Sequence, residues 1–346
     1  MAKYDFVVFH HNDLDGYGSA AVVASSLIYA RKVATSEDIT FLVCNYNDKN
    51  PTKARLLDAT GGIYPREVYV VDVSLKSIEE IEELYDMMEN GSKVFWFDHH
   101  EASRLLLSEM RKQSDPVDFV AERAYRRHTE YVRDNMLVMD VNMRYCATWI
   151  CWIHLLADFC EGYRPQIVGI INDWDLWIHE TDKSKFINNA FFAEPDPDED
   201  DTSLKNPCSI TWARILGVYL NKEEDVETLQ QMYDGGLAIA RYKEQTYKNW
   251  FRTYGYVTEF ESYECVCMNW KINSEVFSDW YDQYPLHLIW CFDGEKYHYS
   301  IYTDSKKTGI DCNAIAAKYG GGGHKGAAGF ITDKLVVPYG EKAYVK

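Results

Sequence analysis

The chain has 346 residues, of which 47% are hydrophobic and 15% aromatic, so it is long enough for two globular domains. Its formal net charge of −18 disfavours extended binding to duplex nucleic acid, which usually needs a basic face. We expect no membrane span, because no run of about 18 apolar residues occurs. Nine scattered cysteines and the lack of a signal peptide predict reduced thiols and a cytoplasmic location.

The first hundred residues alternate between strand and helix signals. Short apolar segments predict strands at residues 6–9, 41–44, 68–71 and 94–97. Helices are predicted at 16–34 and at 77–90, where Ser77 and Glu80 form a capping-box pattern. This alternation predicts an α/β fold with a parallel sheet between covering helices. Ligands of such sheets bind at the carboxyl ends of the strands.

Residues 101–144 break this alternation because both charges are mixed along them, and we predict a helical segment there. Residues 101–145 are therefore a candidate insertion over the site. Its basic residues have two interpretations, an extension of the substrate path or a solvated helix face, and the interleaved acids favour the second. These basic residues are Arg123, Arg126 and Arg127.

The second half of the chain predicts a smaller α/β domain. Helices are expected at 146–160 and, as a bridge between domains, at 225–250. Strands follow at 264–268, 286–292 and 297–302, with a short helix at 313–318. We expect Cys265 and Cys267 to face opposite sides of their strand. The predicted division is a catalytic domain at 1–224, a helical linker at 225–255 and a C-terminal domain at 256–346.

Acidic and histidine side chains follow three of the predicted strands. Each position taken alone also fits a cap or turn, since Asp and Asn are favoured there. Together, at one edge of a parallel sheet, carboxylates and imidazoles are the ligands that two divalent metal ions need. These side chains belong to His11, Asp13 and Asp15 after the first strand, Asp72 after the third, and Asp98, His99 and His100 after the fourth.

A run of four glycines, residues 320–323, lies near the C-terminus and is followed by His324 and Lys325. One interpretation is a flexible loop. The other is a backbone cradle for a phosphate or nucleotide, which the adjoining basic side chains favour.

These motifs resemble the DHH family of phosphoesterases, which is named for its Asp-His-His sequence. Residues 11–16 (His-Asn-Asp-Leu-Asp-Gly) are similar to the first motif of the family, Asp72 to the second, residues 98–100 to the third and Asp173 to the fourth. Residues 320–330 resemble the DHH-associated C-terminal domain. The resemblance implies two lobes with the active site in the cleft between them.

The resemblance also implies a role for each residue at these positions. Two divalent ions, usually manganese in this family, would be held by His11, Asp13, Asp15, Asp72, His99 and Asp173. Asp72 would bridge the ions, and a water between them would attack phosphorus in line. His100 would face the scissile phosphate while Asp98 orients the histidines. Two alternatives stay open, His10 in place of His11 and Asp175 in place of Asp173.

The resemblance places substrate binding in the C-terminal domain, at Gly321, Gly322, Gly323 and His324. Tyr302 stands where many relatives carry an arginine, and it could stack on a base or hydrogen-bond a phosphate. The two-lobed chain is similar to nanoRNases, which degrade very short RNAs to mononucleotides. We therefore expect a short single-stranded oligonucleotide as partner. Alternatives are hydrolysis of linear or cyclic dinucleotides, removal of phosphate from phosphoadenosine phosphate, or a non-catalytic nucleic-acid scaffold.

Overall fold

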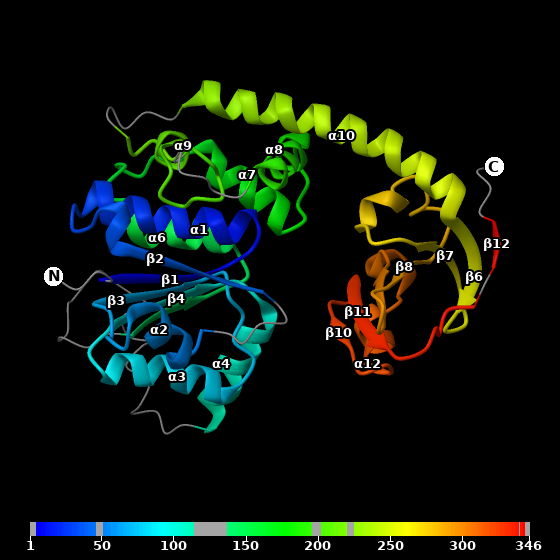
Figure 1. Ribbon diagram of the computed structural model, residues 1–346, viewed down its shortest axis with the longest axis horizontal. Coiled ribbons are helices and arrows are strands. Elements are labelled where there is room, and N and C mark those ends of the chain that lie inside the picture. The colour runs from blue at the N-terminus through cyan, green and yellow to red at the C-terminus, as the bar shows by residue number, and fades with distance from the viewer. Residues whose placement is uncertain are drawn as a thin grey trace. The chain divides into compact units, whose positions relative to one another are not determined.

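The protein is described here by a computed structural model (Figure 1). It divides into two compact units, Met1–Ile239 and Ala240–Lys346, which are described separately. The helix α10 (Val226–Tyr254) crosses the boundary between them. The structure describes residues 5–45, 51–113, 137–195, 202–219, 225–338 and 340–342.

The sheet of the first unit has five parallel strands in the order β2-β1-β3-β4-β5 (Figure 1). Its central strands are buried on both faces, which is why they are continuous apolar runs in the sequence. Burying a side chain such as Phe6 or Phe9 contributes about 1.5–3 kcal/mol. The strands are β1 (Phe6–His11), β2 (Ile39–Cys44), β3 (Glu67–Val71), β4 (Lys93–Asp98) and β5 (Leu137–Val141).

Helices cover both faces of this sheet (Figure 1). Alternate strand residues define the two cores: Phe6 and Val8 pack with one set of helices, Val7 and Phe9 with the other. The first set is α1 (Leu14–Ser25) with η1 (Ser26–Ala30), α6 (Ala147–Leu155), α7 (Gln166–Asp175), α8 (Asp182–Ala193) and α9 (Ile210–Ile215). The second set is α2 (Lys53–Thr60), α3 (Ile78–Glu89) and α4 (Glu101–Gln113).

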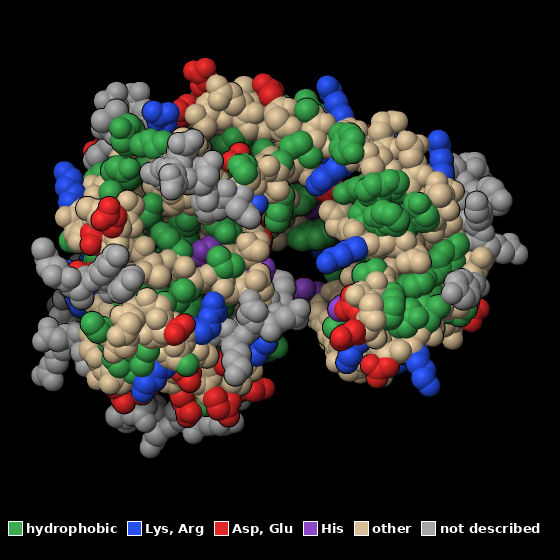
Figure 2. Space-filling view, viewed as in Figure 1, with side chains coloured by type: hydrophobic (Ala, Val, Ile, Leu, Met, Phe, Trp, Pro, Cys, Tyr) green, Lys and Arg blue, Asp and Glu red, His purple; other side chains and the backbone are tan. Residues whose placement is uncertain are grey.

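The helix α3 shows how the sequence signals are realised. The Ser77 side chain accepts from the backbone N–H of Glu80, and the Glu80 side chain accepts from that of Ser77, which confirms the predicted capping box. Ile81, Leu84 and Met87 are buried against the sheet. The opposite side of α3 is acidic, and Figure 2 shows acidic side chains gathered over this part of the first unit. Much of the negative charge is therefore solvated surface.

The prediction of a helix throughout residues 101–144 was wrong in part. α4 occupies the beginning, but β5 is a fifth strand of the parallel sheet. Its sequence, Leu-Val-Met-Asp-Val, is a short apolar run, and the mixed charges around it hid that signal. Arg123, Arg126 and Arg127 lie outside the described residues.

The second unit is built on a seven-stranded mixed sheet in the order β10-β11-β9-β8-β7-β6-β12. The β7–β8 pair is parallel and the other pairs are antiparallel. This second sheet confirms the predicted α/β architecture of two parts. The strands are β6 (Gly255–Phe260), β7 (Tyr263–Asn269), β8 (Leu286–Phe292), β9 (Tyr297–Tyr302), β10 (Gly322–Gly323), β11 (Ala327–Thr332) and β12 (Glu341–Lys342).

Two cores stabilise this sheet. On one face α12 (Cys312–Ala317) packs through Ile315 and Ala316, and on the other the end of α10 packs through Phe251. Cys265 and Cys267 point to the same face, with their sulfur atoms 3.5 Å apart. The expectation of opposite faces was wrong because residues two apart on a strand share a face. Within the described part of the chain, none of the helices has the length and apolarity of a membrane span.

Candidate metal centre

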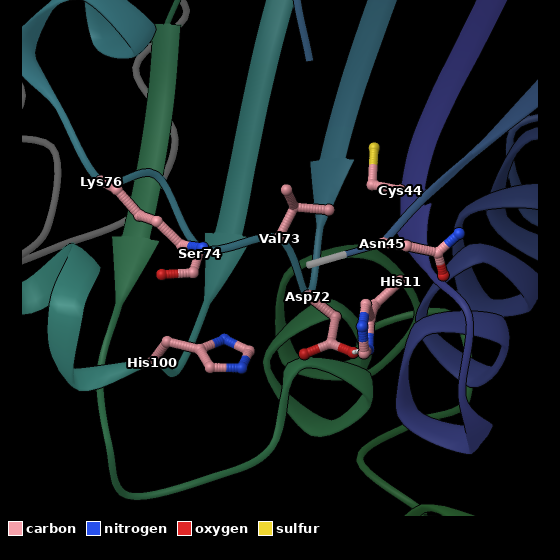
Figure 3. Close-up of a pocket in the computed structure, with 8 residues that line it drawn as sticks. All are labelled: His11, Cys44, Asn45, Asp72, Val73, Ser74, Lys76 and His100. Atoms are coloured by element: carbon pink, nitrogen blue, oxygen red, sulfur yellow. Dashed lines mark ion pairs between the residues drawn. The ribbon is translucent and has the colours of Figure 1, made fainter. Parts of the chain in front are cut away.

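The register of the parallel sheet brings the predicted site residues to one level. His10 pairs with Val71, and Val71 pairs with Phe97. The residues that follow in each strand are His11, Asp72 and Asp98, so they meet at the carboxyl edge of the sheet. In Figure 3 the Asp72 carboxylate lies between the rings of His11 and His100.

The turn after β1 is held by Asp13. One carboxylate oxygen, Oδ1, accepts from the backbone N–H of Gly16 at 2.9 Å and caps α1, while Oδ2 lies 2.6 Å from His11 Nδ1. Burial opposes ionisation, but the His11 hydrogen bond outweighs it and the pKa of Asp13 is lowered to about 2. A Cβ at Gly16 would lie 2.2 Å from the His11 carbonyl oxygen, so this turn requires glycine. The N-cap of α1 and this part of the candidate site are therefore formed by the same residue, Asp13.

Asp15 is buried between α1 and α6. Its Oδ2 and Oδ1 accept from the backbone N–H groups of Ala147 and Thr148, both at 2.8 Å, at the N-terminus of α6. These bonds satisfy two N–H groups that a helix leaves without partners. They also fix the carboxylate with Oδ2 3.7 Å from His99 Nε2.

Asp72 occupies the centre of the site and is almost fully buried. Its φ of 57° is in the left-handed region, which a non-glycine residue adopts at an energetic cost that is often found at functional sites. Burial, followed by the charges of Asp13 and Asp15, raises the pKa of Asp72 well above its ordinary value. The protein thus holds a carboxylate where its negative charge is unfavourable unless a cation is present.

The two histidines that follow β4 have different environments. Asp98 is buried and lies 2.7 Å from His100 Nδ1 through its Oδ1. Burial disfavours the imidazolium of His100, yet the Asp98 hydrogen bond outweighs this and raises the pKa of His100. His99 instead has a lowered pKa, chiefly because of burial. A neutral imidazole is the form that binds a metal.

The structure brings Asp175, rather than Asp173, to this cluster. Asp175 Oδ2 lies 3.2 Å from His99 Nε2. Both acids are on α7, and residues two apart on a helix point in different directions. Asp173 Oδ1 accepts from the backbone N–H of Glu180 at 2.8 Å. Burial and then the charge of Asp15 raise the pKa of Asp175 well above its ordinary value.

His10, the alternative to His11, faces the core. Adjacent strand residues point to opposite faces, and the His10 ring packs edge-on against Tyr17 at 4.6 Å. Its Nδ1 donates to the His11 carbonyl oxygen at 2.8 Å. Burial lowers the pKa of His10 to about 4. The structure therefore places His11, and not His10, beside Asp13 and Asp72.

Three groups among the described residues have ligand atoms within 4.8 Å of one another. Asp72 and His99 each belong to two of them, so the groups form adjoining pockets of oxygen and nitrogen ligands. Asp72 Oδ2, His99 Nε2 and Asp175 Oδ2 are buried without a hydrogen-bond partner among the described residues. Such buried orphan atoms are costly unless an ion satisfies them, so the donor set fits divalent cations. The groups are Asp72, His99 and His100; His11, Asp13 and Asp72; and Asp15, His99 and Asp175.

A pocket lined by His11, Asp72 and His100 also has Cys44, Val73 and three polar residues that the sequence patterns did not single out (Figure 3). The three polar residues are Asn45, which follows β2, and Ser74 and Lys76, which follow β3. The rule that ligands bind at the carboxyl ends of parallel strands would have identified them.

The glycine run of the second unit forms a tight hairpin. Gly322 and Gly323 are β10, and they pair with Gly329 and Ala328 of β11. The exposed His324 closes the turn, where its N–H donates to the Ala327 carbonyl oxygen at 2.7 Å. The structure therefore differs from a flexible loop. Tyr302 lies on β9 and pairs with Ala327 of β11. Its side chain is half-buried and packs against the core that contains Phe251.

Comparisons with known proteins agree with this architecture. Residues 5–125 match the family model described as DHH family, N-terminal domain. This part of the chain is therefore similar to the DHH family, as the sequence motifs predicted. The match agrees with the predicted metal-dependent phosphoesterase. The predicted resemblance is thereby confirmed. No curated protein matches the chain significantly.

Several solved structures are similar to the chain at low sequence identity. The DHH domain of a protein described as a member of a ribosomal-protein family is 14% identical with a TM-score of 0.51, covering 95% of this chain and 83% of that one. A pGpG-specific phosphodiesterase from Vibrio cholerae, PggH, is 13% identical with a TM-score of 0.48, covering 96% and 94%. The exonuclease RecJ bound to manganese is 14% identical with a TM-score of 0.44, covering 95% and 86%.

Proposed function

We propose that the protein is a two-metal phosphodiesterase that hydrolyses short oligonucleotides to mononucleotides. The observation that supports this most is the sharing of Asp72 and His99 between adjoining ligand groups, since two neighbouring cations need shared or closely spaced ligands. The ligands we propose are His11, Asp13, Asp15, Asp72, His99 and Asp175, with Asp175 replacing Asp173.

Some residues of the site would bind the cations, and others would bind the phosphate. Two divalent ions, when bound, would lower the pKa of a water and offset charge on the phosphoryl oxygens. Asp13 and Asp15 are held by backbone N–H groups, so the ligand set is preorganised. Asp98 fixes the ring of His100 through Nδ1, which leaves Nε2 to hydrogen-bond the phosphoryl group. The raised pKa of His100 favours the protonated, doubly donating ring.

We propose that the hairpin of the second unit grips the substrate through Gly321, Gly322, Gly323 and His324. His324 is exposed and follows a tight turn, so it is available to a ligand. The acidic balance of the chain supports a short substrate over a long duplex. Nine free cysteine thiols support the cytoplasm as its location.

A substrate panel tests the proposal. It contains 5′-labelled RNAs and DNAs of about two to twenty nucleotides, cyclic dinucleotides and phosphoadenosine phosphate, each with Mn²⁺, with Mg²⁺ and with a chelator. We expect metal-dependent cleavage, highest with Mn²⁺, and a kcat/KM that peaks at about two to five nucleotides. An equal or greater rate on long single strands would contradict the preference for short substrates. A preference for phosphoadenosine phosphate or a cyclic dinucleotide would move the activity to that substrate.

A further inference from the structure

The end of α7 carries an unusual residue. Trp177 N–H donates to the Trp174 carbonyl oxygen at 3.1 Å, and Ile178 N–H donates to that of Asp173 at 3.0 Å. These are the two bonds of a Schellman motif, in which the residue after the C-cap adopts a left-handed conformation and is usually glycine. Here that residue is Trp177, with φ of 53°.

The helix α9 ends with the same motif and the expected residue. Gly217 N–H donates to the Arg214 carbonyl oxygen at 2.9 Å, Val218 N–H donates to that of Ala213 at 3.0 Å, and Gly217 has φ of 64°. The two helices therefore close with equivalent bonds, but α7 places a tryptophan where α9 has a glycine. The tryptophan is not explained by packing, because 70% of Trp177 is exposed.

The segment after α7 is also tied down firmly. His179 is left-handed as well, with φ of 54°, and its ring lies 5.3 Å from that of Trp174 and 5.5 Å from that of Trp177. Asp173 holds both ends of this segment, since its carbonyl oxygen accepts from Ile178 N–H and its carboxylate accepts from Glu180 N–H. Strained residues of this kind are enriched at functional sites.

Trp177 also lies close to the metal centre along the chain. Trp177 follows the cluster residue Asp175 by two positions, so their Cα atoms are within about 7 Å. A rigid, exposed aromatic ring is the surface on which nucleobases stack, whatever their sequence.

We propose that Trp177 is a stacking platform for a nucleobase of the substrate next to the scissile phosphate, and that Asp173 is the positioning residue that holds it. The inference rests on the proposed function and deepens it. It assigns the substrate class to phosphodiesters that carry bases, as opposed to sugar phosphates or inorganic polyphosphates. It also gives Asp173 a purpose other than metal binding.

The test compares a dinucleotide with its abasic analogue on Trp177→Ala, Trp177→Gly and Trp177→Phe. We expect the first two variants to lower kcat/KM for the dinucleotide by at least about tenfold, an effect typical of losing a base–aromatic stack, and to leave the abasic analogue unchanged. Trp177→Phe should keep most of the preference for the base. The thermal midpoint of Trp177→Gly should not fall, because glycine suits this motif as Gly217 does. Tyr242→Ala, which removes a 72% exposed aromatic residue of α10, is the matched control.

Equilibrium binding of the same two labelled ligands, measured with Ca²⁺, separates this inference from the proposed function. If wild-type protein cleaves neither ligand, the proposed function fails, and base-dependent binding that is lost in Trp177→Ala would still support the stacking platform. Equal effects on both ligands, or no effect, would overturn it. A changed oligomeric state of Trp177→Ala on gel filtration, without a change in base preference, would instead identify a protein contact and also overturn it.

Asp173→Ala, which removes the acceptor of the Glu180 N–H, tests the positioning role through a different readout. We expect this variant to lose the preference for the base, mainly through KM, while its bound Mn²⁺ content stays that of the wild type. Asp175→Asn should lose bound Mn²⁺ instead. Loss of Mn²⁺ from Asp173→Ala would make Asp173 a ligand and would overturn its assignment as a positioning residue.

Discussion

The carboxyl edge of the five-stranded sheet and the β10–β11 hairpin of the second unit are built in opposite ways. At the sheet edge, buried acids face one another, and polar atoms of Asp72, His99 and Asp175 lack partners among the described residues. In the hairpin the polar groups are exposed or satisfied, since Gly323 N–H donates to Asn313 Oδ1 at 3.0 Å and His324 N–H donates to the Ala327 carbonyl oxygen. The sheet-edge cluster is therefore electrostatically unfavourable until a ligand binds. The polar groups of the hairpin need no ligand to be satisfied.

This difference between the sheet edge and the hairpin predicts whether a substitution changes activity or stability. In the sheet-edge cluster, removing a charge should abolish activity while relieving repulsion in the metal-free fold. In the hairpin, a substitution of a glycine should affect stability through packing, and only the side chain of His324 should affect catalysis alone.

Asp72→Asn should lower kcat by at least about a thousandfold, or about 4 kcal/mol of barrier, because it removes a charge shared by two ligand groups. Turnover and bound metal are measured together, and bound Mn²⁺ should fall as well. Glu79→Gln, which changes an exposed acid on α3, is the control and should behave as the wild type. Activity within about tenfold of the wild type, or about 1.4 kcal/mol, would show that Asp72 is not a bridging ligand.

His324→Ala should lower kcat/KM by about a hundredfold, roughly 2.7 kcal/mol, with unchanged metal content. The reason is that a residue gripping the substrate can position the phosphate without binding a metal. His298→Ala, which removes a half-buried histidine of β9 that pairs with Asp293, is the control. Loss of metal from His324→Ala would make His324 a ligand, and normal kinetics would leave the hairpin without a role in substrate binding.

Gly323→Ala should destabilise the second unit by about 2 kcal/mol. Its φ of 152° disfavours a side chain, and a Cβ there would lie 2.6 Å from the Ala327 carbonyl oxygen. Gly322→Ala is the control, because the nearest heavy atom to its Cβ would be Asn313 Oδ1 at 3.6 Å. Hydrogen exchange of the β9 and β11 amides measures both variants. Equal stability of the two would show that the hairpin is not limited by packing.

Much of the fold could be predicted because the strands are apolar runs with clear boundaries. β8 and β9 coincide with the predicted ranges, and the four predicted strands of the first unit all occur. β5 was missed because its five residues lie among mixed charges. β6 and β11 of the second unit were not predicted either.

The sequence predicts only those site residues whose position follows directly from the end of a strand. Strand period alone leaves His10 and His11 equivalent until it is known which face of β1 borders the site. The choice between Asp173 and Asp175 depends on the rotation of α7, which packing sets and the local sequence does not. The left-handed Trp177 gave no sequence signal, since glycine is the residue that marks such a position.

The smallest expected effect concerns the stability of the metal-free protein as a function of pH. The raised pKa of Asp72 means that the folded state keeps a proton that the unfolded chain has lost. Stability should therefore fall as pH rises from the ordinary pKa of an aspartate, about 4, towards the raised one. The lowered pKa of Asp13 acts in the opposite direction but at lower pH, where stability is lost as the pH falls from about 4 towards about 2.

Asp72→Asn should flatten this slope because it has no proton to lose. Urea midpoints of both proteins, measured in chelator between about pH 5 and pH 8, should diverge as the pH rises, with the wild type losing more. The slope is the informative quantity, since the buried amide of the variant lowers its stability equally at every pH. Asp175 retains a raised pKa in the variant, so part of the slope should persist until Asp175→Asn is added. Added Mn²⁺ should reverse the order, because only the wild type gains stability from binding it. If the urea midpoints of the two proteins change with pH in parallel in chelator, the acids at the sheet edge do not repel one another. The contrast with the hairpin would then disappear.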